Sequence, residues 1–138
     1  MSEKAGMGLH LELAMEVSAV ETARTALLKF LEPTDPDDRA INRIEVVLEE
    51  LVSNVVRHAD RATRIVLSAD LCEDGLCLWI EDDGAAFDPL AAQENARFDR
   101  LENATLGGLG IPLIKRLTRS VDYERSGRVN RMKVVFAL

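Results

Sequence analysis

Residues 41–60 carry the first group of side chains that could do chemistry. Glu50 and Asn54 stand four positions apart, which on a helix places them on one face, about 40° apart around its axis. Arg57 and His58 continue that face for another turn. A glutamate can accept a proton from a hydroxyl or a water, and an asparagine oxygen is a hard ligand that suits Mg²⁺. The face is therefore either solvated or the wall of a polar site.

A second group stands where an apolar run ends. Leu78 and Ile80 alternate with other residues in the manner of a strand, and Asp82 continues their face, so its carboxylate points toward the interior. An inward carboxylate can accept a hydrogen bond from the exocyclic amine of a base. The chain then breaks at 84–89, GAAFDP, where Gly84 allows close approach of a ligand to the backbone.

A third group is the glycine cluster at 107–110, GGLG, which leads directly into the apolar-faced stretch 111–117. Glycines before a helix let backbone amides approach a phosphate, and the helix N-terminus adds a partial positive charge. The cluster is not a Walker A loop, because no Gly-Lys-Ser/Thr follows, and its spacing does not fit the dinucleotide-binding fingerprint. The three groups together suit a purine nucleotide with Mg²⁺.

Two helices are expected before the first predicted hairpin. Alternating leucines predict a strand at 9–13, and Ser18 with Glu21 reads as a capping box that opens the first helix. The second helix covers 41–60. Its apolar stripe is Ile44, Val47, Leu48, Leu51 and Val55, and its candidate caps are Asp35, Asp37 and Asp38.

The rest of the chain alternates with a period of two. Strands are predicted at 64–71 and 76–82, joined by a turn, and again at 120–125 and 132–138, with the mixed segment 90–106 between the two pairs. The expected fold class is α+β: a two-layer sandwich in which an antiparallel or mixed sheet carries the helices on one face. We expect one domain spanning residues 1–138.

Composition narrows the function classes. A net charge of −7 over 138 residues argues against a nucleic-acid or anionic-membrane surface, because phosphate backbones need a dense Lys/Arg footprint. No apolar run approaches the roughly 20 residues of a membrane span, and the start lacks the apolar core of a secretory signal. We expect a cytoplasmic protein in which Cys72 and Cys77 are ordinary reduced cysteines.

The three groups resemble the ATP-binding domain of the GHKL superfamily, which gyrase, histidine kinases and MutL share. Within it the chain is most similar to anti-sigma factor serine-protein kinases of the RsbW and SpoIIAB type. The matching motifs, in the order of the family, are ELVSNVVRHA at 50–59, DDGAAFDP at 82–89 and GGLGIPLI at 107–114. The resemblance covers nearly the whole chain and implies a Bergerat-type ATP-binding fold with residues 90–106 as a lid.

The resemblance also implies roles for individual residues. Asn54 would ligate Mg²⁺, Glu50 would be the catalytic base, and Asp82 would bind the adenine amino group. Arg57 would contact a phosphate, although a surface ion pair is an equal alternative for it. The remaining cofactor-binding residues that the motifs imply are Gly84, Phe87, Gly107, Gly108, Leu109, Gly110 and Ile111.

The chain departs from the family pattern at two places. Ala86 stands where a second glycine is frequent, but the Phe-Asp-Pro that follows at 87–89 is typical of the anti-sigma branch. The family also often has a threonine near the start of its last strand, close to the nucleotide. Asn130, Arg131 and Met132 stand there, and the sequence assigns that contact to none of them.

The resemblance implies an ATP- and Mg²⁺-dependent serine/threonine kinase. It would phosphorylate an anti-anti-sigma protein of the STAS type, bind a sigma factor in its other nucleotide state, and form a homodimer. One alternative is a nucleotide-responsive partner-switch protein without efficient kinase activity, against which the presence of Glu50 argues. Another is a histidine kinase catalytic domain, which needs a phospho-accepting helix pair that we do not expect ahead of the predicted strand at 9–13.

Overall fold

The computed structural model describes residues 8–58, 61–73, 75–91 and 110–138. Its elements in chain order are β1 (Leu9–Leu13), α1 (Ala19–Leu31), the 3-10 helix η2 (Glu32–Thr34), α2 (Asp38–His58), β2 (Ile65–Cys72), β3 (Gly75–Asp82), α5 (Gly110–Leu117), β4 (Ser120–Ser126) and β5 (Val129–Phe136). Most of segment 90–106, which the resemblance implies to be a lid, lies outside the described residues.

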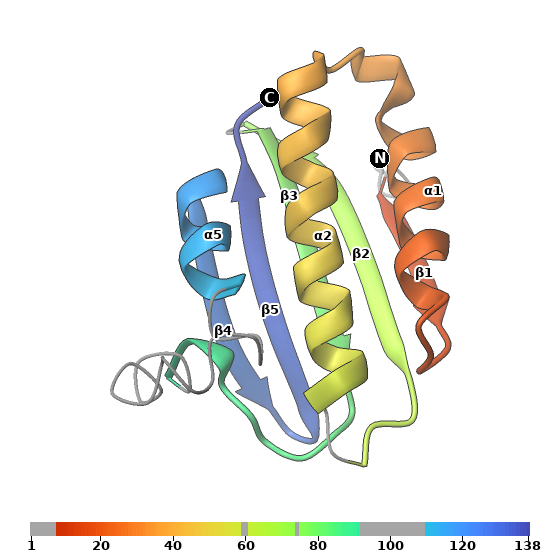
Figure 1. The fold of residues 1–138 in the computed structure, drawn as a ribbon, viewed down its shortest axis with the longest axis vertical. Coiled ribbons are helices and arrows are strands. Elements are labelled where there is room, and N and C mark those ends of the chain that lie inside the picture. The colour runs from red at the N-terminus through yellow and green to blue at the C-terminus, as the bar shows by residue number, and fades with distance from the viewer. Residues whose placement is uncertain (1–7, 59–60, 74, 92–109) are drawn as a thin grey trace.

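The described strands form one five-stranded sheet in the order β1-β2-β3-β5-β4. Every recorded pairing in it is antiparallel. Helices α1, α2 and α5 lie side by side over one face of this sheet, with α2 in the middle (Figure 1). The predicted α+β two-layer architecture is confirmed, and the sheet is antiparallel rather than mixed.

Helix α2 forms because its apolar stripe meets the sheet. Ile44, Val47, Leu48 and Leu51 are all buried, and full burial of such a side chain is worth about 1.5–3 kcal/mol. Of the three candidate caps, Asp37 acts: its Oδ1 accepts a hydrogen bond of 2.8 Å from the Ala40 amide. The buried stripe fixes which side of α2 remains for Glu50 and Asn54.

The predicted capping box at the start of α1 is wrong. Ser18 lies in helical conformation, with φ −63° and ψ −13°, and makes no side-chain cap hydrogen bond. Its hydroxyl donates instead to Glu16, over 3.1 Å. A capping side chain needs an extended backbone at its own position to reach the free amides of the first turn.

Strand β5 begins at Val129, three residues before the predicted start. The predicted strand at 132–138 excludes the polar residues Asn130 and Arg131, yet they pair with Asp82 and Glu81 of β3. Their polarity has a structural reason, because Asn130 faces the interior beside Asp82 and Arg131 pairs with Glu81 at 3.1 Å on the other face. The last strand therefore carries part of the polar site as well as part of the core.

The face of the sheet away from the helices is polar around one aromatic side chain. Trp79 lies under two cations, with the Arg131 guanidinium 5.5 Å and the Lys133 ammonium 5.7 Å from its ring centroid. Cys72 and Cys77 are free thiols on the same face, with their sulfur atoms 2.8 Å apart. None of the helices in the described part of the chain has the length and apolar character that crossing a bilayer requires.

Candidate functional site

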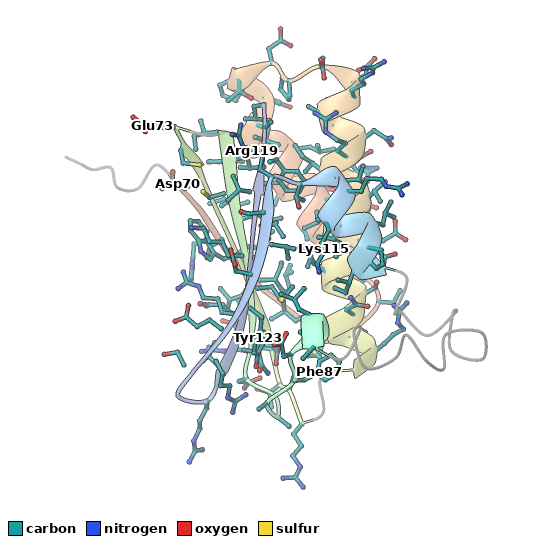
Figure 2. All side chains as sticks on the ribbon, turned by 90° about the vertical axis from the view of Figure 1, so that its left-hand side faces the viewer. Asp70, Glu73, Phe87, Lys115, Arg119 and Tyr123 are labelled. Atoms are coloured by element: carbon teal, nitrogen blue, oxygen red, sulfur yellow. The ribbon has the colours of Figure 1, made fainter. Side chains whose placement is uncertain are left out.

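A pocket that is partly open to solvent lies where the C-terminal half of α2 meets the sheet. Its apolar lining includes Leu51, Val55, Ile80, Phe87, Pro89 and Met132, and its polar lining is Asn54, Asp82, Tyr123 and Asn130. Phe87 and Tyr123 both lie at the lower end of the molecule in Figure 2. A largely apolar slot with a few convergent polar groups is the usual form of a small-molecule site.

Asp82 is the buried charge-bearing group of this pocket, with 9% of its surface exposed. Its Oδ1 accepts two hydrogen bonds, from the Gly84 amide at 2.9 Å and from Asn130 Nδ2 at 3.0 Å. No described residue donates to Oδ2. One carboxylate oxygen is thus held by the protein, and the other is left for a donor on a ligand.

Asn130 also holds the chain segment that follows Asp82. Its Nδ2 donates to the Ala85 carbonyl at 2.9 Å, and its Oδ1 accepts from the Phe87 amide at 3.2 Å. Arg125 donates to the Gly84 carbonyl at 2.8 Å. Segment 84–87 therefore has its backbone tied to β4 and β5, so its shape does not depend on a ligand.

Asn130 and Tyr123 belong to none of the three sequence motifs, and the sequence predicts no contact for either of them. The signal was present, because Asn130 shares the period-two face of Met132, Val134 and Phe136, all of which are buried. A polar residue on a buried strand face needs partners. Tyr123 supplies one, since its hydroxyl donates to Asn130 Oδ1, and burial raises the pKa of Tyr123 so that it stays a donor.

Asn54 lines the pocket from α2, and its side-chain oxygen has a protein partner. Arg57 Nη2 donates to Asn54 Oδ1 over 3.1 Å. A divalent cation on that oxygen would repel the guanidinium, so it requires Arg57 to turn away. The Arg57 side chain is exposed, and it can swing toward solvent or toward a phosphate. Nothing is described for the His58 side chain.

Glu50 lies against the first described residue of α5. A Cβ atom added to Gly110 would overlap the Glu50 carboxylate and would stand 3.1 Å from its Cδ. The structure thus brings the predicted base and one glycine of the second motif into contact, where α2 and α5 run side by side (Figure 1). Ile111 follows with its side chain in the core, and Gly107, Gly108 and Leu109 lie outside the described residues.

Asp83, the residue that follows β3, does not line the pocket. Its carboxylate accepts hydrogen bonds from the Thr63 amide at 2.7 Å, from the Thr63 hydroxyl and from the Arg64 amide at 3.3 Å. The Thr63 hydroxyl, and after it the Thr63 amide, lower the pKa of Asp83 to about 2. This residue fastens the chain before β2 to the end of β3.

Three solved structures share this fold. The chain superposes with a TM-score of 0.68 and 20% identity on a structure of the RsbU and RsbW domains of Rv1364c from Mycobacterium tuberculosis, covering 95% of this chain and about a third (32%) of that one. It matches the SiaB-SiaC complex from Pseudomonas aeruginosa with a TM-score of 0.62, 18% identity and coverage of 91% and 87%. A histidine kinase domain from Erythrobacter litoralis follows at 0.52, with 15% identity and coverage of 91% and 61%. At these identities the matches establish the fold.

Comparison of the sequence with other proteins identifies related proteins that carry functional names. The chain is 29% identical over 125 residues to the serine/threonine-protein kinase BtrW of Bordetella bronchiseptica, covering 86% of this chain and 88% of that protein. It is 21% identical over 103 residues to an anti-sigma F factor of Clostridium perfringens, with coverage of 72% and 74%. The model of the histidine kinase-like ATPase domain matches residues 13–136. The chain therefore belongs to the histidine kinase-like ATPase domain family.

Proposed function

We propose that this chain is an ATP-dependent serine/threonine protein kinase of the anti-sigma type, with the adenine in the pocket between α2 and the sheet. The observation that carries the proposal is Asp82. It is a buried carboxylate with one oxygen held by Gly84 and Asn130, while the other receives no hydrogen bond from any residue that the structure describes, in a pocket that is otherwise mostly apolar. An exocyclic amine on a flat apolar ring satisfies such a site, because a buried acceptor needs a donor.

The phosphates would then lie toward the N-terminus of α5, beside Gly110. The contact between Glu50 and Gly110 supports this direction, since it places a candidate base next to a helix start that favours anions. Gly107, Gly108 and Leu109 belong to the same proposed phosphate site on their motif alone. Asn54 would hold Mg²⁺, which supplies charge neutralisation on the phosphate oxygens when bound. Arg57, released from Asn54, would contact a phosphate.

The chain's own part in the reaction is proton transfer and positioning. In the proposed step, Glu50 accepts the proton of a serine or threonine hydroxyl on a partner protein as that oxygen bonds to the γ-phosphorus. The bond from phosphorus to the β–γ bridging oxygen breaks, and ADP leaves. Phosphoryl transfer depends mainly on alignment and charge stabilisation, so one base and one metal ligand are sufficient protein groups.

The proposed substrate is a small anti-anti-sigma protein of the STAS type, with a sigma factor as the partner in the other nucleotide state. The relatives named serine/threonine-protein kinase and anti-sigma F factor support this choice. In the proposed function, residues 1–138 form one domain that acts as a homodimer. Residues 90–106 would be a lid, and the state of the lid would select the partner. A ligand shifts such an equilibrium only through its different affinity for the two states.

The test is phosphotransfer from γ-labelled ATP to the anti-anti-sigma protein encoded nearest to this chain. We expect label on that protein with the wild type and about 10²–10⁴-fold slower transfer with Glu50→Gln, because the variant keeps the shape but cannot accept the proton. Glu49→Gln is the matched control, since Glu49 is the adjacent, exposed residue on α2.

Two outcomes would contradict the proposal. Nucleotide binding without any transfer by the wild type would leave a partner-switch binding protein instead of a kinase. Equal transfer by Glu50→Gln and the wild type would remove Glu50 as the base.

A further inference from the structure

We propose that Asn130 is a positioning residue that makes the pocket select a purine carrying a 6-amino group. It does so by holding one oxygen of the Asp82 carboxylate, so that the other oxygen faces the ligand as an acceptor. This inference rests on the proposed nucleotide function and adds a determinant of base specificity to it. It comes from the hydrogen bonds around Asn130, a side chain with only 5% of its surface exposed.

The orientation of the Asn130 amide follows from its backbone partners. The Phe87 amide can only donate, so the atom 3.2 Å from it must be the oxygen of Asn130. The Ala85 and Gly84 carbonyls can only accept, and they lie 2.9 Å and 3.4 Å from the other end, which must be the nitrogen. The amide therefore has a single arrangement that satisfies all of its neighbours.

The orientation of the Asn130 amide determines which hydrogen bond Asp82 receives from it. The Asn130 nitrogen and the Gly84 amide both donate to Oδ1, and they hold the carboxylate from the side of the sheet. Oδ2 is left as an acceptor in a pocket whose lining is largely apolar. A 6-amino group donates to this oxygen, whereas a 6-oxo group would set two acceptors against each other out of water, which is unfavourable.

Tyr123 supports the same arrangement from β4. Its hydroxyl donates to Asn130 Oδ1, so both lone pairs of that oxygen are used, one by Tyr123 and one by Phe87. Loss of the hydroxyl would free one lone pair and weaken the restraint on the amide without touching Asp82. Tyr123→Phe is therefore a milder change than any substitution of Asn130, and it keeps the ring that lines the pocket.

The experiment measures ADP and IDP binding by calorimetry, with MgCl₂ present, on the wild type, Asn130→Ala, Asn130→Asp and Tyr123→Phe. IDP differs from ADP in carrying an oxygen at position 6 in place of the amino group and a hydrogen on the adjacent N1. We expect the wild type to prefer ADP by about 10–100-fold, the range of one hydrogen bond to a charged group. Both Asn130 variants should lose most of that preference. In Tyr123→Phe the preference for ADP over IDP should fall about threefold, because one hydrogen bond to Asn130 is lost. Asn42→Ala, an exposed asparagine of α2, should keep it.

The ratio of the two affinities separates a positioning role from a purely structural one. If the Asn130 variants and Tyr123→Phe weaken the binding of ADP and IDP equally, the ratio of the two affinities is unchanged and Asn130 does not set specificity. Equal affinity of the wild type for ADP and IDP would also overturn the inference while leaving nucleotide binding intact. A wild type that binds neither nucleotide would overturn the proposed function together with it. Because Tyr123→Phe removes a single hydroxyl, the ratio can be measured even if an Asn130 variant fails to fold.

Discussion

Gly110 holds a position that no other residue type can take without moving Glu50. The absent side chain is what gives the Glu50 carboxylate its place beside α5, because a Cβ there would overlap it. A glycine in this motif is usually explained by the approach of a phosphate to the backbone. In this chain the same glycine also makes room for the proposed base.

At the residue scale this predicts a specific defect for Gly110→Ala. The added methyl group should displace the Glu50 carboxylate and slow phosphotransfer by about tenfold or more, since a misplacement of 1 Å can cost about 100-fold. The rate of labelled phosphate transfer measures this, and a melting curve checks the fold.

A double variant provides the control for this prediction. Glu50→Asp shortens the side chain by one methylene, so Gly110→Ala should cost much less in that background than in the wild type. Contacting residues give such non-additive effects, whereas independent residues give additive ones. An additive result would mean that Gly110 acts without Glu50.

At the element scale, the alternation of apolar residues predicted most of the framework. The burial stripe of α2 and the inward face of Leu78, Ile80 and Asp82 both follow from periodicity, and both are confirmed. Periodicity failed at the start of β5, where Asn130 interrupts the apolar pattern. Its partners lie on β3, on β4 and in the 84–87 segment, and no local pattern encodes such distant contacts.

The same limit applies to the candidate site. Glu50 and Asn54 share a helix face by spacing alone, so the sequence was sufficient to pair them. The hydrogen bond from Arg57 to Asn54, the contact of Glu50 with Gly110 and the network of Asn130 and Tyr123 depend on packing between elements. These contacts could not be read from motifs, which record the types of residues but not the atoms that meet.

The hydrogen bonds that link Asp83, after β3, to Thr63 and Arg64, before β2, give a prediction about pH. The ordinary pKa of an aspartate lies near 3.8, and the folded pKa of Asp83 is about 2, so its carboxylate stabilises the fold above pH 4. That stabilisation is lost as the pH falls from about 4 toward 2. Asp83→Ala should therefore lower the melting temperature at neutral pH, and the difference from the wild type should shrink in acid.

Melting curves from about pH 7 down to about pH 2.5 test this. Asp122→Ala is a suitable control, because Asp122 is an exposed aspartate of β4 whose side chain makes no hydrogen bond with the described residues. A difference between Asp83→Ala and the wild type that stays constant across this range would argue against the role of the carboxylate charge.

At the scale of the whole molecule, stability rests on the layer between the helices and the sheet. Leu48 is 1% exposed in that layer, whereas Leu71, near the end of β2, is 47% exposed. Leu48→Ala should lower the free energy of unfolding by about 2–5 kcal/mol, through lost burial and the cavity left behind. Leu71→Ala should change it by less than about 0.5 kcal/mol. Urea denaturation compares the two, and equal losses would mean that the core lies elsewhere.

The register of β3 and β5 has a consequence for how this chain can vary. Asp82 and Asn130 are direct partners across the two strands. The residues between them, 83–129, are therefore a detour whose two ends are joined by the sheet, although β4 within it also pairs with β5. Each doubling of the length of such a detour adds only about 0.6 kcal/mol to the entropic free-energy cost of closing the loop. Insertions or deletions that spare α5, β4 and residues 84–89 can therefore change the length of this detour without altering the described residues that hold Asp82.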